Sequence, residues 1–247
     1  MTYGVPQLAA AAVIVCGASL LKGAIGFGFP LVAIPLLSMI MGPRVAIPVV
    51  AFPTLLSNAL VLRRGGAGGA AAMIPVLAAI ALGTPAGALL IRALDPRLLS
   101  ALIGAVAMLY VLAIASRLTL KIPKGASRRA GPVIGLLAGV MGGATGISSP
   151  LLAIYLHFLR FEKRQFVFWM TVMFFVVNVA QVISYLRLGL YAGPMLRMAL
   201  WACLPMALGT LAGLALQDRI QQRAFERLVL VVVSLASLYL LGRGLFR

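Results

Sequence analysis

The sequence Gly23-Ala-Ile-Gly-Phe-Gly-Phe-Pro-Leu31 occurs again, 120 residues later, as Gly143-Ala-Thr-Gly-Ile-Ser-Ser-Pro-Leu151. Both copies interrupt long apolar segments. Glycine and proline at this density break helices, and unwound backbone at membrane depth is tolerated only where protein or a water-filled cavity satisfies its polar groups. The duplication therefore predicts two broken membrane helices in corresponding positions, a pattern typical of transport sites.

The composition is that of an integral membrane protein. Of the 247 residues, 63% are hydrophobic and only 10% are charged, and the mean hydropathy is +1.11. This leaves too little polar surface to coat a soluble domain of this size. The net charge of +17 is carried by basic residues that stand singly or in short clusters between apolar segments, as in loops that face anionic lipid headgroups. No contiguous basic face or aromatic platform is present, so we expect no nucleic-acid partner.

Ten apolar segments follow one another along the chain. They span about residues 6–28, 30–42, 45–62, 70–91, 97–116, 131–146, 149–159, 165–186, 194–217 and 224–245. Most approach the ~20 residues that a membrane-spanning helix needs. The short ones flank the two Gly/Pro breaks, as expected of discontinuous helices.

Further matches extend the duplication through both halves. Asn58 matches Asn178 at the same spacing, and residues 83–87 match residues 209–213 at a spacing of 126. Each half thus holds about five segments, and an odd number of segments turns the second half upside down relative to the first. We therefore expect an all-α polytopic membrane protein with 8 to 10 membrane segments, built from two inverted repeats. Each repeat would contain a broken helix with its half-helix and three spanning helices.

The expected division of the chain is a first transmembrane repeat over residues 1–116, a basic linker over 117–130 and a second transmembrane repeat over 131–247. The linker is the most basic loop of the chain. By the positive-inside rule it lies in the cytoplasm, which places both termini on the opposite side.

The half-helices that follow the breaks would begin near the middle of the bilayer and point their N-termini at each other. Free backbone amides and the positive ends of helix dipoles bind anions, and proline in the first turn loses no helical hydrogen bond. Glycine lets the backbone approach a small anion, while threonine and serine hydroxyls donate hydrogen bonds to it. We expect the substrate-binding residues to be Gly26, Phe27, Gly28, Phe29 and Pro30 of the first break, Thr145, Gly146, Ser148, Ser149 and Pro150 of the second, and the polar residues Asn58, Asn178 and Lys22.

Each of these features has a structural alternative. Glycine spaced four residues apart also allows close packing of membrane helices without any ligand, and this is the expected role of the pairs within residues 83–87, 135–139 and 209–213. Asn58 and Asn178 either belong to the site or form an interhelical hydrogen bond. Lys22 either attracts the anion or extends its ammonium to the membrane surface.

Other functions find less support in the sequence. The four acidic residues, Asp95, Glu162, Asp218 and Glu226, fall in or beside loops, and His157 is the only histidine. No catalytic motif is present, so we expect neither an enzyme nor a metal or cofactor site. A passive small-anion channel would use the same backbone amides and remains the alternative, although no repeated ring of charges indicates a pore. The sequence leaves the oligomeric state open.

The duplicated Gly-x-x-Gly-x-x-x-Pro-Leu motif resembles that of the TauE/SafE sulfite exporter family, also called toluene-sulfonate uptake permeases. The resemblance covers essentially the whole chain. It implies a secondary transporter of sulfite, sulfoacetate, thiosulfate or related sulfonates, placed as a multi-pass protein in the bacterial inner membrane. The second break has Ile147-Ser-Ser where the first has Phe27-Gly-Phe, so the two halves of the expected site are not equivalent.

Overall fold

The computed structural model describes residues 3–25, 28–62, 70–115, 126–159, 161–216 and 222–246, and these residues form helices joined by turns, without strands. The helices are α1 (Val5–Ile25), α2 (Phe29–Met41), α3 (Pro43–Leu62), α4 (Ala70–Ala93), α5 (Pro96–Ala115), α6 (Ala126–Thr145), α7 (Ser149–Phe158), α8 (Lys163–Arg187), α9 (Met195–Trp201), α10 (Cys203–Leu216) and α11 (Gln222–Phe246).

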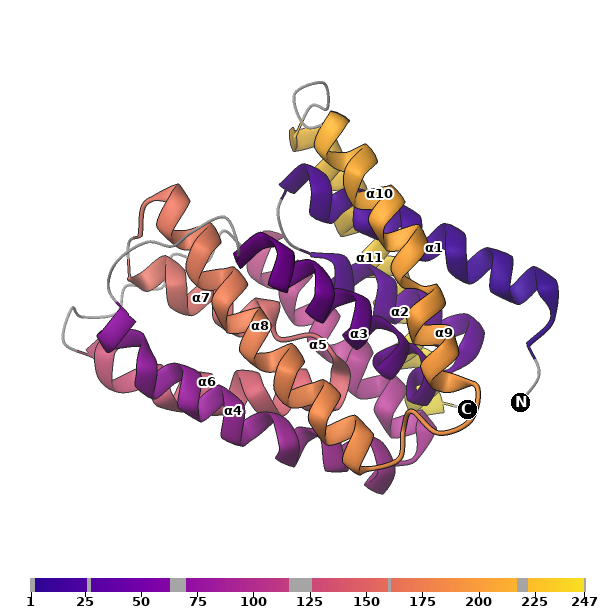
Figure 1. Ribbon diagram of the computed structural model, residues 1–247, viewed down its shortest axis with the longest axis horizontal. Coiled ribbons are helices and arrows are strands. Elements are labelled where there is room, and N and C mark those ends of the chain that lie inside the picture. Colours follow the sequence, from indigo (N-terminus) through magenta and orange to yellow (C-terminus); the bar gives the residue numbers. More distant parts are fainter. Residues whose placement is uncertain are drawn as a thin grey trace.

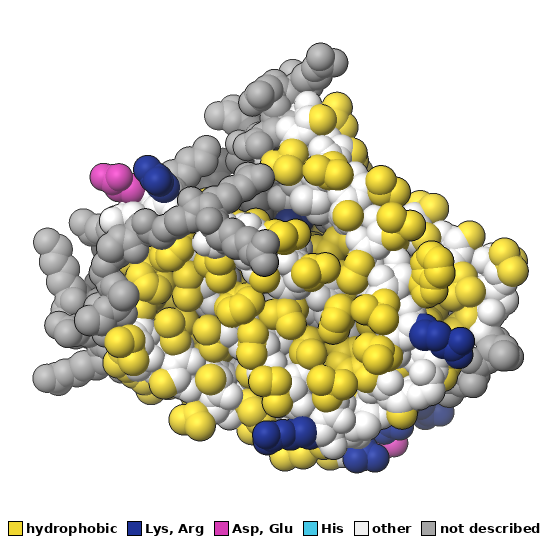
Figure 2. All heavy atoms as spheres, in the orientation of Figure 1, with side chains coloured by type: hydrophobic (Ala, Val, Ile, Leu, Met, Phe, Trp, Pro, Cys, Tyr) yellow, Lys and Arg dark blue, Asp and Glu magenta, His cyan; other side chains and the backbone are white. Residues whose placement is uncertain are grey.

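The helices are those of a polytopic membrane protein. Among the described residues, seven spans are long and apolar enough to cross a membrane, with α9 and α10 together making one of them, and α2, α7 and the apolar part of α6 are shorter. Figure 2 shows hydrophobic side chains covering most of the visible face, with the coloured basic side chains mainly towards its edges. This is the surface expected of a protein that faces lipid along its middle and headgroups at its ends.

The helix bounds agree with the expected segments to within a few residues, with two differences. The expected segment 194–217 is divided at Ala202, where α9 ends and α10 begins. Pro205 explains the interruption because proline lacks the N–H that would bond to the carbonyl of Trp201 and its ring crowds that carbonyl. In addition, α6 begins at Ala126, inside the range expected for the linker; residues 116–125 lie outside the described part of the chain.

Helix α1 of the first half packs along α10 of the second half (Figure 1). Their backbones are so close that a Cβ atom added to Gly23 would collide with the carbonyl oxygen of Thr210, and one added to Gly209 would collide with that of Cys16. Glycine is therefore required at both positions of this helix pair.

The pair of α4 and α6 repeats this arrangement with the two halves exchanged. A Cβ atom at Gly143 would collide with the Thr84 carbonyl, and one at Gly83 would collide with the Leu136 carbonyl. Each residue of this set is the repeat equivalent of one in the α1 and α10 contact. The prediction of glycine-mediated helix packing is confirmed, and the two pairs lie at opposite ends of the molecule in Figure 1.

Helices α5 and α11, which close the two halves, show how the halves are related. Gly104 of α5 lies against Ser237 of α11, whereas Gly244, near the end of α11, lies against Arg97 and Ala101 at the start of α5. The two helices are therefore antiparallel. A two-fold axis along the helices would make them parallel, so the axis that relates the halves runs across them, as an inverted repeat requires.

Helices α3 and α8, the third helix of each half, pack together between the two outer pairs. Both carry buried polar residues, among them Asn58 of α3 and Asn178 of α8. The fold thus places the polar residues of its two halves face to face inside the protein.

Candidate functional site

Both breaks end at one buried cavity. Helix α2 starts there after the first break and α7 starts there after the second. Helices α1, α3 and α8 complete the walls. The residues that line the cavity are Lys22, Gly28, Phe29, Pro30, Thr54, Asn58, Gly146, Ile147, Ser148, Ser149, Phe174, Val177 and Asn178.

The backbone of each break contains a glycine in the left-handed region, Gly28 with φ of 99° and Gly146 with φ of 74°. Other residues adopt this conformation only at a cost. Gly28 and Ser148 are the N-cap residues of α2 and α7, and neither helix has a side-chain cap for its first amides. Both helices therefore begin at the cavity wall, and the N–H groups of their first turns have no capping side chain as a hydrogen-bond acceptor.

Lys22 is the one basic side chain among the described residues that line the cavity. Its side chain is only 7% exposed, and its Nζ donates a hydrogen bond to Oδ1 of Asn58 at 2.7 Å. The alternative that Lys22 extends to the membrane surface is wrong in this structure. No carboxylate is among the described residues that line the cavity, so the Lys22 amino group is held by a neutral amide.

From Lys22 a chain of buried hydrogen bonds crosses both halves of the protein. Asn58 Nδ2 donates to Asn178 Oδ1 at 2.9 Å, and Asn178 Nδ2 donates to Gln181 Oε1 at 2.7 Å. Gln181 Nε2 then donates to the Gly142 carbonyl at 2.7 Å. The two asparagines therefore form the interhelical hydrogen bond that the sequence allowed and also line the cavity.

The chain is asymmetric because the two halves differ at two pairs of equivalent positions, one of which is Val61 of α3 and Gln181 of α8. Lys22 of α1 corresponds to Gly142 of α6. In the first half, Asn58 accepts a hydrogen bond from the lysine; in the second half, Gln181 reaches the backbone that glycine leaves accessible. The two halves thus contribute different partners to this hydrogen-bond chain, a basic side chain from α1 and a backbone carbonyl from α6.

The structure brings most of the predicted site residues together. Nine of them line the cavity: Lys22, Gly28, Phe29, Pro30, Asn58, Gly146, Ser148, Ser149 and Asn178. Thr145 does not, since its hydroxyl donates to the Met141 carbonyl at 2.7 Å and accepts from the Ile147 amide at 3.2 Å. Pro150, in the first turn of α7, is buried but is not part of the wall. Gly26 and Phe27 lie outside the described residues.

Several residues of the site were not predicted. Thr54, Ile147, Phe174 and Val177 line the cavity. Tyr185 lies outside the wall, and its Oη donates to the Gly143 carbonyl at 2.8 Å. Tyr185 follows Asn178 by two helical turns, so the two residues lie on the same face of α8. This spacing could have predicted that Tyr185 lies near the site.

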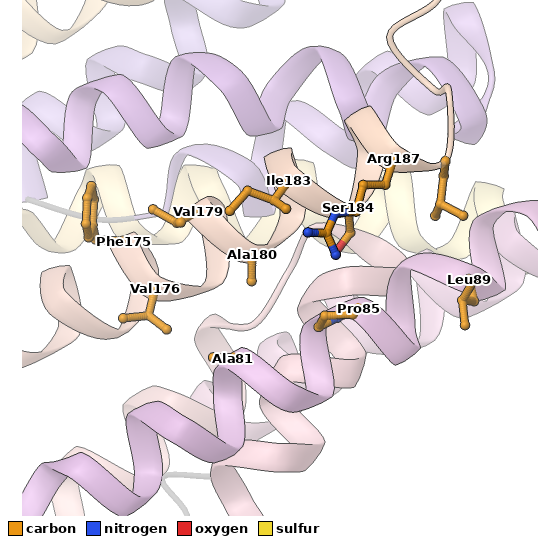
Figure 3. A pocket seen from close by; sticks show the side chains of 11 residues that line it. Ala81, Pro85, Leu89, Phe175, Val176, Val179, Ala180, Ile183, Ser184 and Arg187 are labelled. Carbon is orange, nitrogen blue, oxygen red and sulfur yellow. The ribbon is translucent and has the colours of Figure 1, made fainter.

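The cavity is small in this conformation. It offers about 20 Å3 of space to the centre of a water molecule, which is room for one or two waters. A larger hollow of about 510 Å3 lies between α4 and α8 (Figure 3) and shares no residue with this cavity. Its walls are mainly apolar, whereas side-chain amides, hydroxyls and the Lys22 amino group line the smaller cavity.

Comparison with known proteins identifies the family of the chain. The family model described as Sulfite exporter TauE/SafE matches residues 10–240, which include both breaks and both halves. No curated protein and no solved structure matched the chain. The match over nearly the whole length shows that the chain belongs to the TauE/SafE sulfite exporter family.

Proposed function

We propose that this protein is a secondary transporter of small sulfur-containing anions, such as sulfite, sulfoacetate or a related sulfonate or thiosulfate, across the bacterial inner membrane. The anion binds between the N-termini of α2 and α7 and crosses by alternating access. The family supports an exporter-type transporter of anions, and the substrate class and mechanism are our extension of it.

The observation that carries the proposal is the convergence of three sources of positive potential on one cavity. The first turns of α2 and α7 offer uncapped amides, each with a partial positive charge from its helix dipole. In its protonated form, Lys22 adds a full charge, and hydrogen bonds between charged groups are stronger than those between neutral ones. A compact oxyanion would satisfy all three at once.

The small size of the cavity supports alternating access. A sulfur oxyanion is larger than the one or two waters that the cavity has room for, so binding requires the walls to separate. Inverted repeats supply two such arrangements, because exchanging the conformations of the two halves opens the site to the opposite side. A passive channel would instead need a continuous polar path across the membrane.

Sulfite flux into proteoliposomes tests this function. The full-length protein is reconstituted, and flux is measured with the pH gradient and the membrane potential set independently. Thiosulfate, sulfoacetate and chloride serve as competitors, and liposomes without protein serve as the control.

We expect flux that saturates with sulfite concentration and is inhibited by sulfur oxyanions but not by chloride. Flux that does not saturate and carries chloride equally well would support the channel instead. Absence of flux for every sulfur anion tested would refute the proposed substrate class.

A further inference from the structure

The hollow between α4 and α8 is separate from the anion cavity and has its own chemistry. Figure 3 shows it between the two helices, with side chains from both turned into it. It measures about 510 Å3, within the range of sites that hold an organic ligand. Its lining residues are Ala81, Pro85, Leu89, Phe175, Val176, Val179, Ala180, Ile183, Ser184, Arg187 and Leu188.

The groove follows the direction in which lipid chains lie. On α8 its wall extends from Phe175 to Arg187, and twelve residues of helix rise about 18 Å. Half the hydrocarbon thickness of a bilayer is about 15 Å. The groove therefore matches the depth of one leaflet, and small residues, Ala81 on one wall and Ala180 on the other, keep it open.

Arg187 is the one charged residue among the described residues that line this groove. It is the last residue of α8 and is exposed, and Figure 3 shows its side chain turned towards Ser184 and Pro85. Among the described residues no hydrogen bond or ion pair occupies its guanidinium. The groove thus combines a long apolar wall with an unpaired cation at the end of a membrane helix.

We propose that this groove is a binding site for one anionic phospholipid, with an acyl chain between α4 and α8 and the headgroup phosphate on Arg187. Arginine binds phosphate through two parallel hydrogen bonds, and it stands at the end of the span where phosphates lie. A free inorganic anion would leave the apolar wall uncovered. Because α4 and α8 belong to different halves, the lipid bridges the two repeats.

Native mass spectrometry of the full-length protein tests the site. Delipidated protein is titrated with phosphatidylglycerol, and the dissociation constant of the first bound lipid is measured. Arg187→Gln removes the headgroup contact, and Ala180→Phe fills the groove. Arg92→Gln and Ala78→Phe are the matched controls, since both side chains are exposed on α4 and neither lines the groove.

We expect one tightly retained lipid in the wild type and a dissociation constant raised about fivefold or more by Arg187→Gln and by Ala180→Phe. Both control variants should retain the wild-type affinity. Equal lipid affinity in all five proteins would overturn the proposal. So would binding of inorganic phosphate that blocks the lipid, because it would place the ligand at Arg187 without the groove. The assay involves no transport, so its outcome is independent of the proposed function.

Discussion

Lys22 is a basic residue inside a membrane helix, where an ionisable side chain is costly unless it is paired or functional. Its ammonium has three N–H donors, and Asn58 accepts one hydrogen bond. The ammonium also lines the cavity at which α2 and α7 begin. An anion there would replace a neutral partner by a charged one.

Lys22→Met should therefore weaken sulfite binding. Loss of a hydrogen bond to a charged group costs about 1.5–3 kcal/mol, so we expect the dissociation constant to rise at least tenfold. Isothermal titration of the purified protein measures it, and Lys22→Arg, which keeps the charge, controls for loss of the side chain. An unchanged dissociation constant in Lys22→Met would remove Lys22 from the site.

Asn58 and Asn178 should be coupled energetically because they bond directly to each other. Asn58→Leu and Asn178→Leu should each destabilise the protein, and the double variant should lose less than the sum. Hydrogen bonds in membrane proteins average about 0.6 kcal/mol in such cycles. Unfolding free energies in mixed micelles measure the coupling, and strictly additive losses would show that the contact contributes nothing.

Polar residues at equivalent positions were the predictable part of the site, because duplication marks them twice in the sequence. The hydroxyl of Thr145 was predicted to face the anion, yet it bonds to the backbone of its own break. Sequence pattern does not distinguish these roles, since a threonine in a helix returns its hydroxyl to a preceding carbonyl whenever no better partner is in reach.

The second broken helix is held by α8. Where α6 ends, the Gly142 carbonyl accepts from Gln181 and the Gly143 carbonyl accepts from Tyr185. These bonds satisfy carbonyls at the end of the helix, beside its break. They therefore fix the segment that leads into the α7 N-terminus.

Tyr185→Phe should weaken anion binding by loosening this segment. Tyr191→Phe is the matched control, because Tyr191 is also buried and donates to a backbone carbonyl, that of Pro48, at 2.9 Å. Each variant should lose about 1 kcal/mol of stability, but only Tyr185→Phe should raise the sulfite dissociation constant. Equal affinities in the two variants would show that Tyr185 is structural only.

Apolar length and the Gly/Pro breaks predicted the helices well, since both depend on local sequence. The division between α9 and α10 was missed even though Pro205 was visible. Proline is no reliable breaker in a membrane helix, because neighbouring helices can satisfy the carbonyl that it frees. Pro48 and Pro53, for example, lie inside the continuous helix α3.

The two halves are held together by crossed pairs, α1 with α10 and α4 with α6, at glycine contacts that are equivalent under the repeat. Each outer pair therefore contains one helix from each repeat. The duplicated motifs predicted the inverted repeat, which antiparallel α5 and α11 support. The pairing itself was not predictable, because small-residue spacing identifies a packing face but not its partner.

Gly23→Ala and Gly143→Ala should destabilise the protein to a similar extent, because each methyl group would collide with a carbonyl of the paired helix. Overpacking costs about 1–3 kcal/mol. Gly17→Ala is the control on the same helix α1, since its added Cβ meets nothing within 4 Å. Melting temperatures in detergent measure the effect. A loss in Gly17→Ala as large as in the other two would contradict close packing as the cause.

Anomalous X-ray scattering would locate the bound anion in the protein. Crystals grown in a lipid mesophase with selenite, the selenium analogue of sulfite, would reveal the anion by its selenium signal. We predict a selenium peak between the first turns of α2 and α7, with the selenite oxygens about 3 Å from Lys22 Nζ. Selenium peaks found only elsewhere, at a selenite concentration that inhibits sulfite flux, would contradict an anion site between α2 and α7.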